Sequence, residues 1–230
     1  MEQQDPAGVP GADGDDPAPA RVRGPEILGA TIDLVREQGL SNLRVADVAA
    51  RAGTSPTSVI YYFASKDLLF EQAVADADAR FYDALEPELL SLESGIDRLA
   101  LLIVRSSDSD WRLWMDTRLF ARRSPEMQRA ERGFETRWCQ TIADTIRHGL
   151  KRGEWNATDP DGVAVRLAAL SEGLAEHMIL EHPGRTHGHY LLMMIRAACN
   201  ELGCDESTLW QATERVPAAA AVIPPPEGEQ

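Results

Sequence analysis

Apolar residues recur at helical spacing along almost the whole of this 230-residue chain, and no segment alternates as a strand would. Val45, Val48, Ala49 and Ala52 show the pattern, because they are separated by three, four and seven positions from the first. The segments between such runs carry glycine, proline, serine and aspartate, which favour turns. The sequence therefore predicts an all-α fold, and its 43% of hydrophobic residues can supply a sizeable core.

The helical pattern divides the chain into four parts. Residues 1–20 mix proline, glycine, alanine and aspartate, with too few large apolar groups to offset the entropy of ordering, so they are expected to form a disordered arm. Residues 21–70 are expected to form a small three-helix domain, and residues 71–205 a larger helical bundle. A fourth helix from Ser65 joins the two and should stop at Pro87. Residues 206–230 are expected to form a flexible tail.

Charge is distributed unevenly between these parts. Residues 1–20 hold five acidic residues, and residues 21–66 have a net charge of +2 from six basic and four acidic residues. The rest of the chain therefore carries −11 of the total of −14. The small domain is locally basic, so the acidity of the whole chain does not exclude nucleic-acid binding by this domain.

Two short helices around a tight turn in the small domain predict a helix-turn-helix. Gly53 is placed to end the first of them, and Ser55-Pro56 supplies an N-cap and a proline at the first helical position of the second. The N-terminus of such a second helix reaches base edges in the major groove, and flanking basic and hydroxyl groups suit phosphates. The residues predicted to contact DNA are Arg44, Ser55, Pro56, Thr57, Ser58, Tyr61, Tyr62 and Lys66, with Arg21 and Arg23 as a basic arm.

From Ile27 to Leu69 the chain resembles the N-terminal domain of the TetR family of bacterial transcriptional repressors. The resemblance lies in four blocks in order, "ILGATIDLVREQG", "VADVAARAG", "TSPTSVIYYF" and "SKDLL". It implies a homodimer that reads a pseudo-palindromic DNA operator, and a C-terminal bundle that binds a small-molecule effector and forms the dimer. The chain departs from the family pattern at Ile60, where a polar phosphate contact is usual, and at Arg44, which replaces a hydroxyl residue at the start of the second helix.

Aromatic and acidic side chains in the larger bundle are candidates for the effector site. The candidates are Trp111, Trp114, Met115, Phe134, Trp138, Glu172, Glu176 and His177. Aromatic residues at helical spacing are also typical of an ordinary core, and the three polar residues would also suit a solvated stripe. If tryptophan and carboxylate share a cavity, they favour a cationic or amphipathic effector through cation–π and ionic contacts.

The last two predicted helices, residues 162–180 and 188–202, carry broad apolar faces and are expected to form a two-fold dimer contact. His182, His187 and His189 flank a Pro-Gly turn without metal-ligand spacing, so they are interpreted as a solvated loop, and neither a metal nor a cofactor is expected. Cys139, Cys199 and Cys204 form no CxxC motif, which favours a reducing compartment.

No apolar run is long enough to span a bilayer, and residues 1–20 do not resemble an export signal, so a cytoplasmic location without membrane contact is expected. The chain lacks a Gly-rich phosphate loop and a recognisable nucleophile–base motif, and it is not expected to be an enzyme. The preferred hypothesis is a ligand-responsive, DNA-binding transcriptional regulator, most simply a repressor. The alternative is a dimeric effector-binding protein with weakened DNA binding, motivated by Ile60 and the overall acidity.

Overall fold

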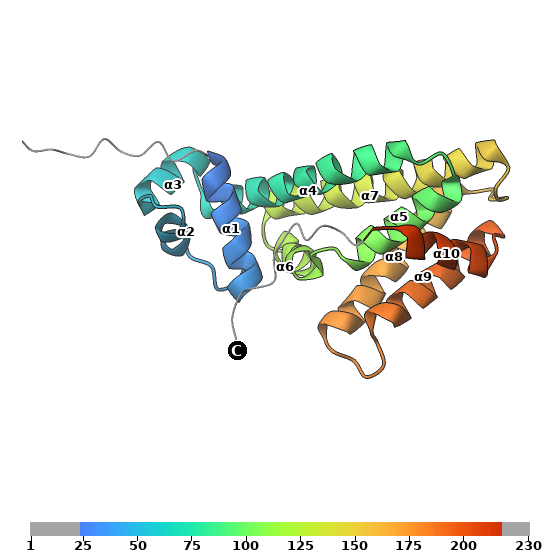
Figure 1. The fold of residues 1–230 in the computed structure, drawn as a ribbon. Helices are drawn as coiled ribbons and strands as arrows, with labels where there is room; N and C mark the ends of the chain where they lie inside the picture. Colours follow the sequence, from blue (N-terminus) through green and yellow to red (C-terminus); the bar gives the residue numbers. More distant parts are fainter. Residues whose placement is uncertain (1–23, 218–230) are drawn as a thin grey trace, which may run out of the picture.

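The computed structural model describes residues 24–217 and places them in ten helices with no strand, which confirms the all-α prediction (Figure 1). The predicted arm at residues 1–20, Arg21 and Arg23, and residues 218–230 of the predicted tail lie outside the described residues. The helices are α1 (Gly24–Gln38), α2 (Val45–Arg51), α3 (Pro56–Phe63), α4 (Lys66–Ser91), α5 (Gly95–Ser107), α6 (Trp111–Ala121), α7 (Pro125–Arg152), α8 (Pro160–Ile179), α9 (His187–Leu202) and α10 (Glu206–Arg215).

Helices α1 to α3 form a small head at one end of the molecule (Figure 1). Gly39 and Gly53 follow α1 and α2 with positive φ angles of 78° and 66°, a conformation that costs glycine little. The stop expected at Gly53 is therefore confirmed. Arg51 of α2 makes a two-point ion pair with Glu37 of α1, at 2.9 and 2.7 Å, which fixes the two helices against each other at the surface.

Helix α4 runs from the head along the bundle beside α7, and it continues to Ser91 (Figure 1). The expected break at Pro87 is wrong. Pro87 is exposed, and the helical hydrogen bond that it lacks would reach the carbonyl of Asp83, which is also exposed and open to water. Buried Leu85 and half-buried Leu89 keep this end of the helix packed against the core, so tertiary packing outweighs the local cost of the proline.

The body is a bundle in which α5, α7, α8, α9 and α10 surround one apolar core, with Tyr82, Trp138 and Tyr190 among its buried side chains. Helix α10 lies where a flexible tail was expected. Asp205 caps it by accepting a hydrogen bond from the Thr208 amide at 2.8 Å, and Leu209 and Ala212 are buried in the core. The apolar spacing in this short helix is visible in the sequence, but it gains its stability from packing against α5.

A second apolar core joins the head to the body. It contains the buried side chains of α1 to α3 and the first half of α4, and it also takes in Leu113 and Trp114 of α6 and Met127 of α7. The boundary expected at residue 70 therefore crosses a continuous core. Leu113 and Trp114 of α6 therefore pack in the same core as the head.

Candidate functional site

The N-terminus of α3 carries four of the residues predicted to contact DNA, from Ser55 to Ser58. The Ser55 side chain caps α3 by accepting a hydrogen bond from the Ser58 amide at 3.1 Å, and Pro56 occupies the first turn. Val59 and Phe63 are buried under the helix, which leaves Ser55, Pro56 and Thr57 exposed. This arrangement presents a short recognition helix by its N-terminus, as a helix-turn-helix requires.

Tyrosine side chains flank this helix on its exposed side. Tyr61 is 85% exposed and Tyr62 is 54% exposed, so both hydroxyls are free to reach a phosphate or a base edge. Their rings pack edge to face, with centroids 5.8 Å apart, which restricts both. Ile60 is 39% exposed beside them and offers no hydrogen bond. The sequence departure at Ile60 thus lies on the surface where a phosphate contact would form.

The two basic residues of the predicted interface, Arg44 and Lys66, differ in exposure and in their contacts within the protein. Arg44 is exposed at the start of α2; its side chain does not cap the helix, but its amide donates to Asp47 at 3.3 Å. The Lys66 ammonium is half-buried; it donates to the Leu43 carbonyl at 2.6 Å and lies 5.2 Å from the Phe70 ring centre. Lys66 therefore ties α4 to the loop before α2. Its part in DNA binding stays a prediction.

In the body, the structure divides the predicted effector residues among several environments. Trp111 and Trp138 are buried in the bundle core, and the Trp111 indole donates to the Ser106 carbonyl at 2.8 Å. Trp114 is buried in the core shared with the head, where it stacks on Phe134 at a ring distance of 3.9 Å. Met115 is half-buried, whereas Glu176 and His177 are exposed.

Glu172 belongs to a cluster of four charged residues where α6, α7 and α8 meet. The Arg118 guanidinium is bonded to Glu172, and it lies 3.3 Å from Glu131 and 3.4 Å from Glu135. All four side chains are partly buried. The pKa of Glu172 is raised: burial, the largest cause, and the nearby Glu135 carboxylate both oppose ionisation, and together they outweigh the opposite effect of Arg118.

This cluster and the aromatic stack are neighbours. Trp114 and Arg118 are four residues apart on α6, and Glu131 and Phe134 are three apart on α7, so each pair shares one face of its helix. Sequence reasoning singled out the aromatic residues and Glu172 but missed Arg118. The available signal was the spacing from Trp114, and only the tertiary fold shows which carboxylates Arg118 meets.

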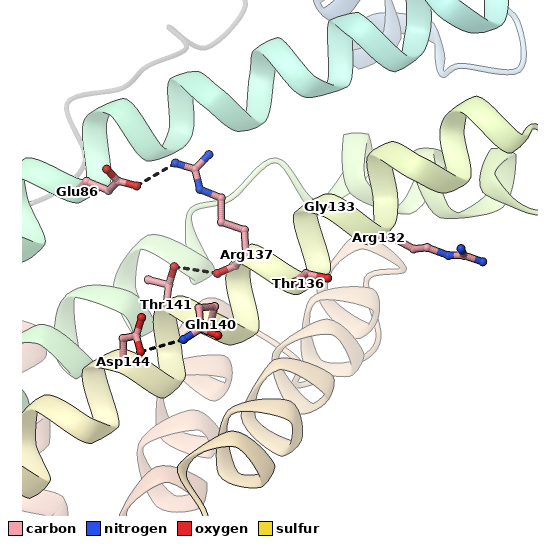
Figure 2. Close-up of a pocket in the computed structure, with 8 residues that line it drawn as sticks. All are labelled: Glu86, Arg132, Gly133, Thr136, Arg137, Gln140, Thr141 and Asp144. Carbon is pink, nitrogen blue, oxygen red and sulfur yellow. Dashed lines mark hydrogen bonds and ion pairs between the residues drawn. The ribbon is translucent and has the colours of Figure 1, made fainter.

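Two hollows accompany this region. A narrow, mostly apolar cavity lies inside the bundle, lined by residues that include Trp138, Met194 and the hydroxyl-bearing Ser106 and Ser171. The other is an open groove lined mainly by residues of α7 with polar side chains, where Arg137 reaches across to Glu86 of α4 at 2.8 Å (Figure 2). Of the predicted effector residues, only Trp138 lines either hollow.

Helix α6 is also fastened to the head by two carboxylates. Asp110, which caps α6, makes an ion pair with Arg36 of α1 at 2.5 Å. Asp116 accepts a hydrogen bond from the Leu40 amide, just after α1, at 2.8 Å. The helix that carries Trp114 and Arg118 thus contacts the last turn of α1 directly.

No helix in the described residues is long and apolar enough to cross a membrane.

Comparison with known proteins gives matches in both parts of the chain. Residues 27–73 match the model "Bacterial regulatory proteins, tetR family", and residues 99–202 match "BetI-type transcriptional repressor, C-terminal". The transcriptional regulator BetI of Cronobacter sakazakii is 26% identical over 161 residues, covering 66% of this chain and 77% of that protein. BetI of Escherichia coli is 24% identical over 183 residues, covering 70% and 94%.

Solved structures share the fold over most of this chain. A transcriptional regulator from Saccharomonospora viridis, in complex with choline, is 26% identical with a TM-score of 0.72, covering 78% of this chain and 96% of that one. A TetR regulator from Haloarcula marismortui has a TM-score of 0.70 at 21% identity, covering 78% and 97%, and shows the shared fold alone. With the helix-turn-helix geometry and both family matches, the chain belongs to the TetR family, as a ligand-responsive, DNA-binding transcriptional regulator.

Proposed function

We propose that this protein is a cytoplasmic repressor that binds a pseudo-palindromic operator as a homodimer and is released from it by a small organic cation. The observation that carries the choice of effector is the cluster around Arg118. There, one guanidinium faces the three carboxylates of Glu131, Glu135 and Glu172. When all are ionised, the cluster has a net charge of −2, and its partial burial weakens screening by water.

An excess of negative charge beside aromatic faces suits a cation whose charged group has no hydrogen-bond donor. The stacked pair of Trp114 and Phe134 supplies such faces next to the carboxylates. Choline, the ligand of the S. viridis relative, is a quaternary ammonium compound of this kind. The proposed effector class is therefore quaternary ammonium, bound at the junction of α6, α7 and α8. The matched relatives are transcriptional regulators, and the proposal includes no enzymatic step.

The contacts of α6 provide a route from this cluster to the head. A ligand that displaces Arg118 or Trp114 moves α6, whose residues Asp110 and Asp116 hold the end of α1. The protein can adopt conformations that differ in the position of the head. The ligand shifts the population between them only if it binds one conformation more tightly than the other. In a dimer, the shifted heads no longer match the spacing of the two operator half-sites.

The exposed face of α8 supports the proposed dimer. Val165, Ala169 and Gly173 are exposed at intervals of four residues along one face of α8, and Leu180 beyond its end is 60% exposed. Small residues in this stripe permit close approach of a second helix. An isologous contact between the same helices of two subunits would cover this face.

Binding of choline is the direct test of the effector proposal. Isothermal titration should show that wild-type protein binds choline, that E172Q binds it at least about tenfold more weakly, and that E176Q binds as the wild type does. Glu176 is the matched control, because it lies one turn further along α8 and is exposed. Equal affinity of all three proteins would refute the role of the cluster, and absence of binding to the wild type would refute the effector class.

DNA binding is tested separately. Sequences selected from random duplex DNA should share a pseudo-palindrome, and affinity for it should fall steeply with salt. Choline should then weaken the complex. The competing function, an effector-binding protein with weakened DNA binding, is favoured by Ile60 and by the engagement of Lys66 with the Leu43 carbonyl. That function predicts choline binding without selection of any sequence at low salt.

A further inference from the structure

The corner between α9 and α10 brings two cysteine thiols together. Cys199 lies in the last turn of α9, and Cys204 follows that helix by two residues. Their Sγ atoms are 2.9 Å apart, less than 1 Å longer than a disulfide bond of about 2.05 Å. No disulfide bond joins the two cysteines in this structure.

The backbone explains why the two thiols meet. Gly203 ends α9 with a φ angle of 71°, and its amide donates to the Cys199 carbonyl at 2.8 Å. This left-handed cap turns the chain so that the residue after the glycine packs back on the last turn of the helix. In this protein, the two packed residues are Cys204 and Cys199. The approach of the sulfur atoms therefore follows from the helix cap and needs no cross-link to maintain it.

We propose that Cys199 and Cys204 are a dithiol–disulfide modification site, oxidised by a low-molecular-weight disulfide such as glutathione disulfide. The half-buried Cys204 reacts first, since Cys199 is only 5% exposed. Its thiolate attacks one sulfur of glutathione disulfide, which breaks that S–S bond, forms a mixed disulfide and releases one glutathione. The Cys199 sulfur then attacks the Cys204 sulfur and releases the second glutathione. Two protein thiols are oxidised, one glutathione disulfide is reduced, and the two thiol protons leave on the two glutathiones.

The surroundings determine the speed of this exchange. Burial raises the pKa of both thiols, and the carboxylates of Asp205 and Glu206 raise that of Cys199 further. Thiolates are therefore scarce near neutral pH, and the pair reacts slowly. Cys139 provides an internal reference, because the neighbour of its thiol is the Glu135 carboxylate at 3.3 Å rather than another sulfur.

The test uses the full-length protein equilibrated in glutathione buffers from fully reduced to fully oxidised. Samples are quenched with acid, unfolded, alkylated with N-ethylmaleimide and weighed intact. The reduced wild type should take up three maleimides, one for each cysteine. The oxidised wild type should lose two hydrogens at Cys199 and Cys204, and its Cys139 should carry either one maleimide or one glutathione. C139S should lose the same two hydrogens and take up none when oxidised.

C204S is the matched variant that lacks the partner, and oxidised C204S should never lose two hydrogens within one chain. Three maleimides on oxidised wild type would overturn the proposal. So would glutathione that stays attached to Cys199 or Cys204, because the neighbouring thiol should displace it. A cross-linked dimer that forms through either cysteine would also overturn it. Measurement at equilibrium removes the slow rate as an explanation of a negative result.

Discussion

Replacing Gly149 with alanine should destabilise the bundle, whereas the same replacement at Gly133, on the same helix, should stabilise it. A Cβ on Gly149 would lie 2.1 Å from the Trp155 indole, whereas ordinary contacts begin at 3.4 Å. On its other side the indole lies close to the Gly95 backbone of α5, since a Cβ built on Gly95 would be 2.9 Å from it. A Cβ on Gly133 meets nothing within 4 Å. The two glycines therefore share the same helix but differ in the space available for a Cβ atom.

The magnitude follows from what the indole loses when it moves. Trp155 is 4% exposed, and its indole N–H donates to the Ile146 carbonyl at 2.8 Å. Complete loss of a core tryptophan costs about 3–5 kcal/mol, which is the upper limit here. Alanine is better than glycine in a helix by about 1 kcal/mol. G149A should therefore lower the free energy of unfolding by about 2–4 kcal/mol, and G133A should raise it by about 0.5–1 kcal/mol.

Thermal unfolding followed by far-ultraviolet circular dichroism measures both effects, at one protein concentration because dimerisation affects the midpoint. For a chain of this size, 1 kcal/mol shifts the midpoint by roughly 2–4 °C. G149A should thus melt about 5–15 °C below the wild type and G133A about 2 °C above it. A G149A midpoint within about 2 °C of the wild type would show that the indole relocates without loss, which would refute the reasoning.

Other predictions concern the head, its link to α6, and pH. S55A removes the cap of α3, so it should cost about 1 kcal/mol of stability and weaken operator binding in a gel-shift titration. D116N weakens the bond to the Leu40 amide by about 1 kcal/mol; if this bond transmits the signal, choline should affect operator affinity less, while choline binding itself is unchanged. Choline affinity should fall as the pH is lowered through the raised pKa of Glu172, because protonation removes negative charge, and E172Q should flatten this dependence in a calorimetric pH series. The raised pKa of Glu172 affects stability in the opposite direction. The folded chain holds the Glu172 proton more tightly than the unfolded chain does. Glu172 therefore stabilises the fold at low pH, and this stabilisation is lost as the pH rises through the pKa of Glu172 in the folded chain.

The sequence predicts the head better than the body for a physical reason. The head is specified by local signals, since Ser55, Pro56 and Gly53 act within one or two turns of their own positions. In the body, the decisive contacts join residues far apart in the chain. The Arg118–Glu172 bond spans 54 residues, and helical periodicity alone does not show which faces of α6 and α8 meet.

Local signals also fail where tertiary packing opposes them. Pro87 disfavours a helix by its own chemistry, yet α4 continues beyond it because Leu85 is packed in the core. Close approach of backbones has no local signal at all. Gly95 and Gly149 permit the start of α5 to lie against the end of α7, and Glu154 then accepts a hydrogen bond from the Gly95 amide at 2.6 Å. Neither glycine marks a turn.

The shared core argues that induction in this protein acts through α6 as well as through α4. Helix α4 is continuous from head to body and provides one route between them. Helix α6 instead contributes Trp114 to the core of the head and Arg118 to the proposed effector cluster, one turn apart. A ligand bound at the Arg118 cluster can therefore affect the head through α6 without moving α4. If both routes operate, D116N should reduce the effect of choline on DNA binding without abolishing it, whereas abolition would assign the whole signal to α6.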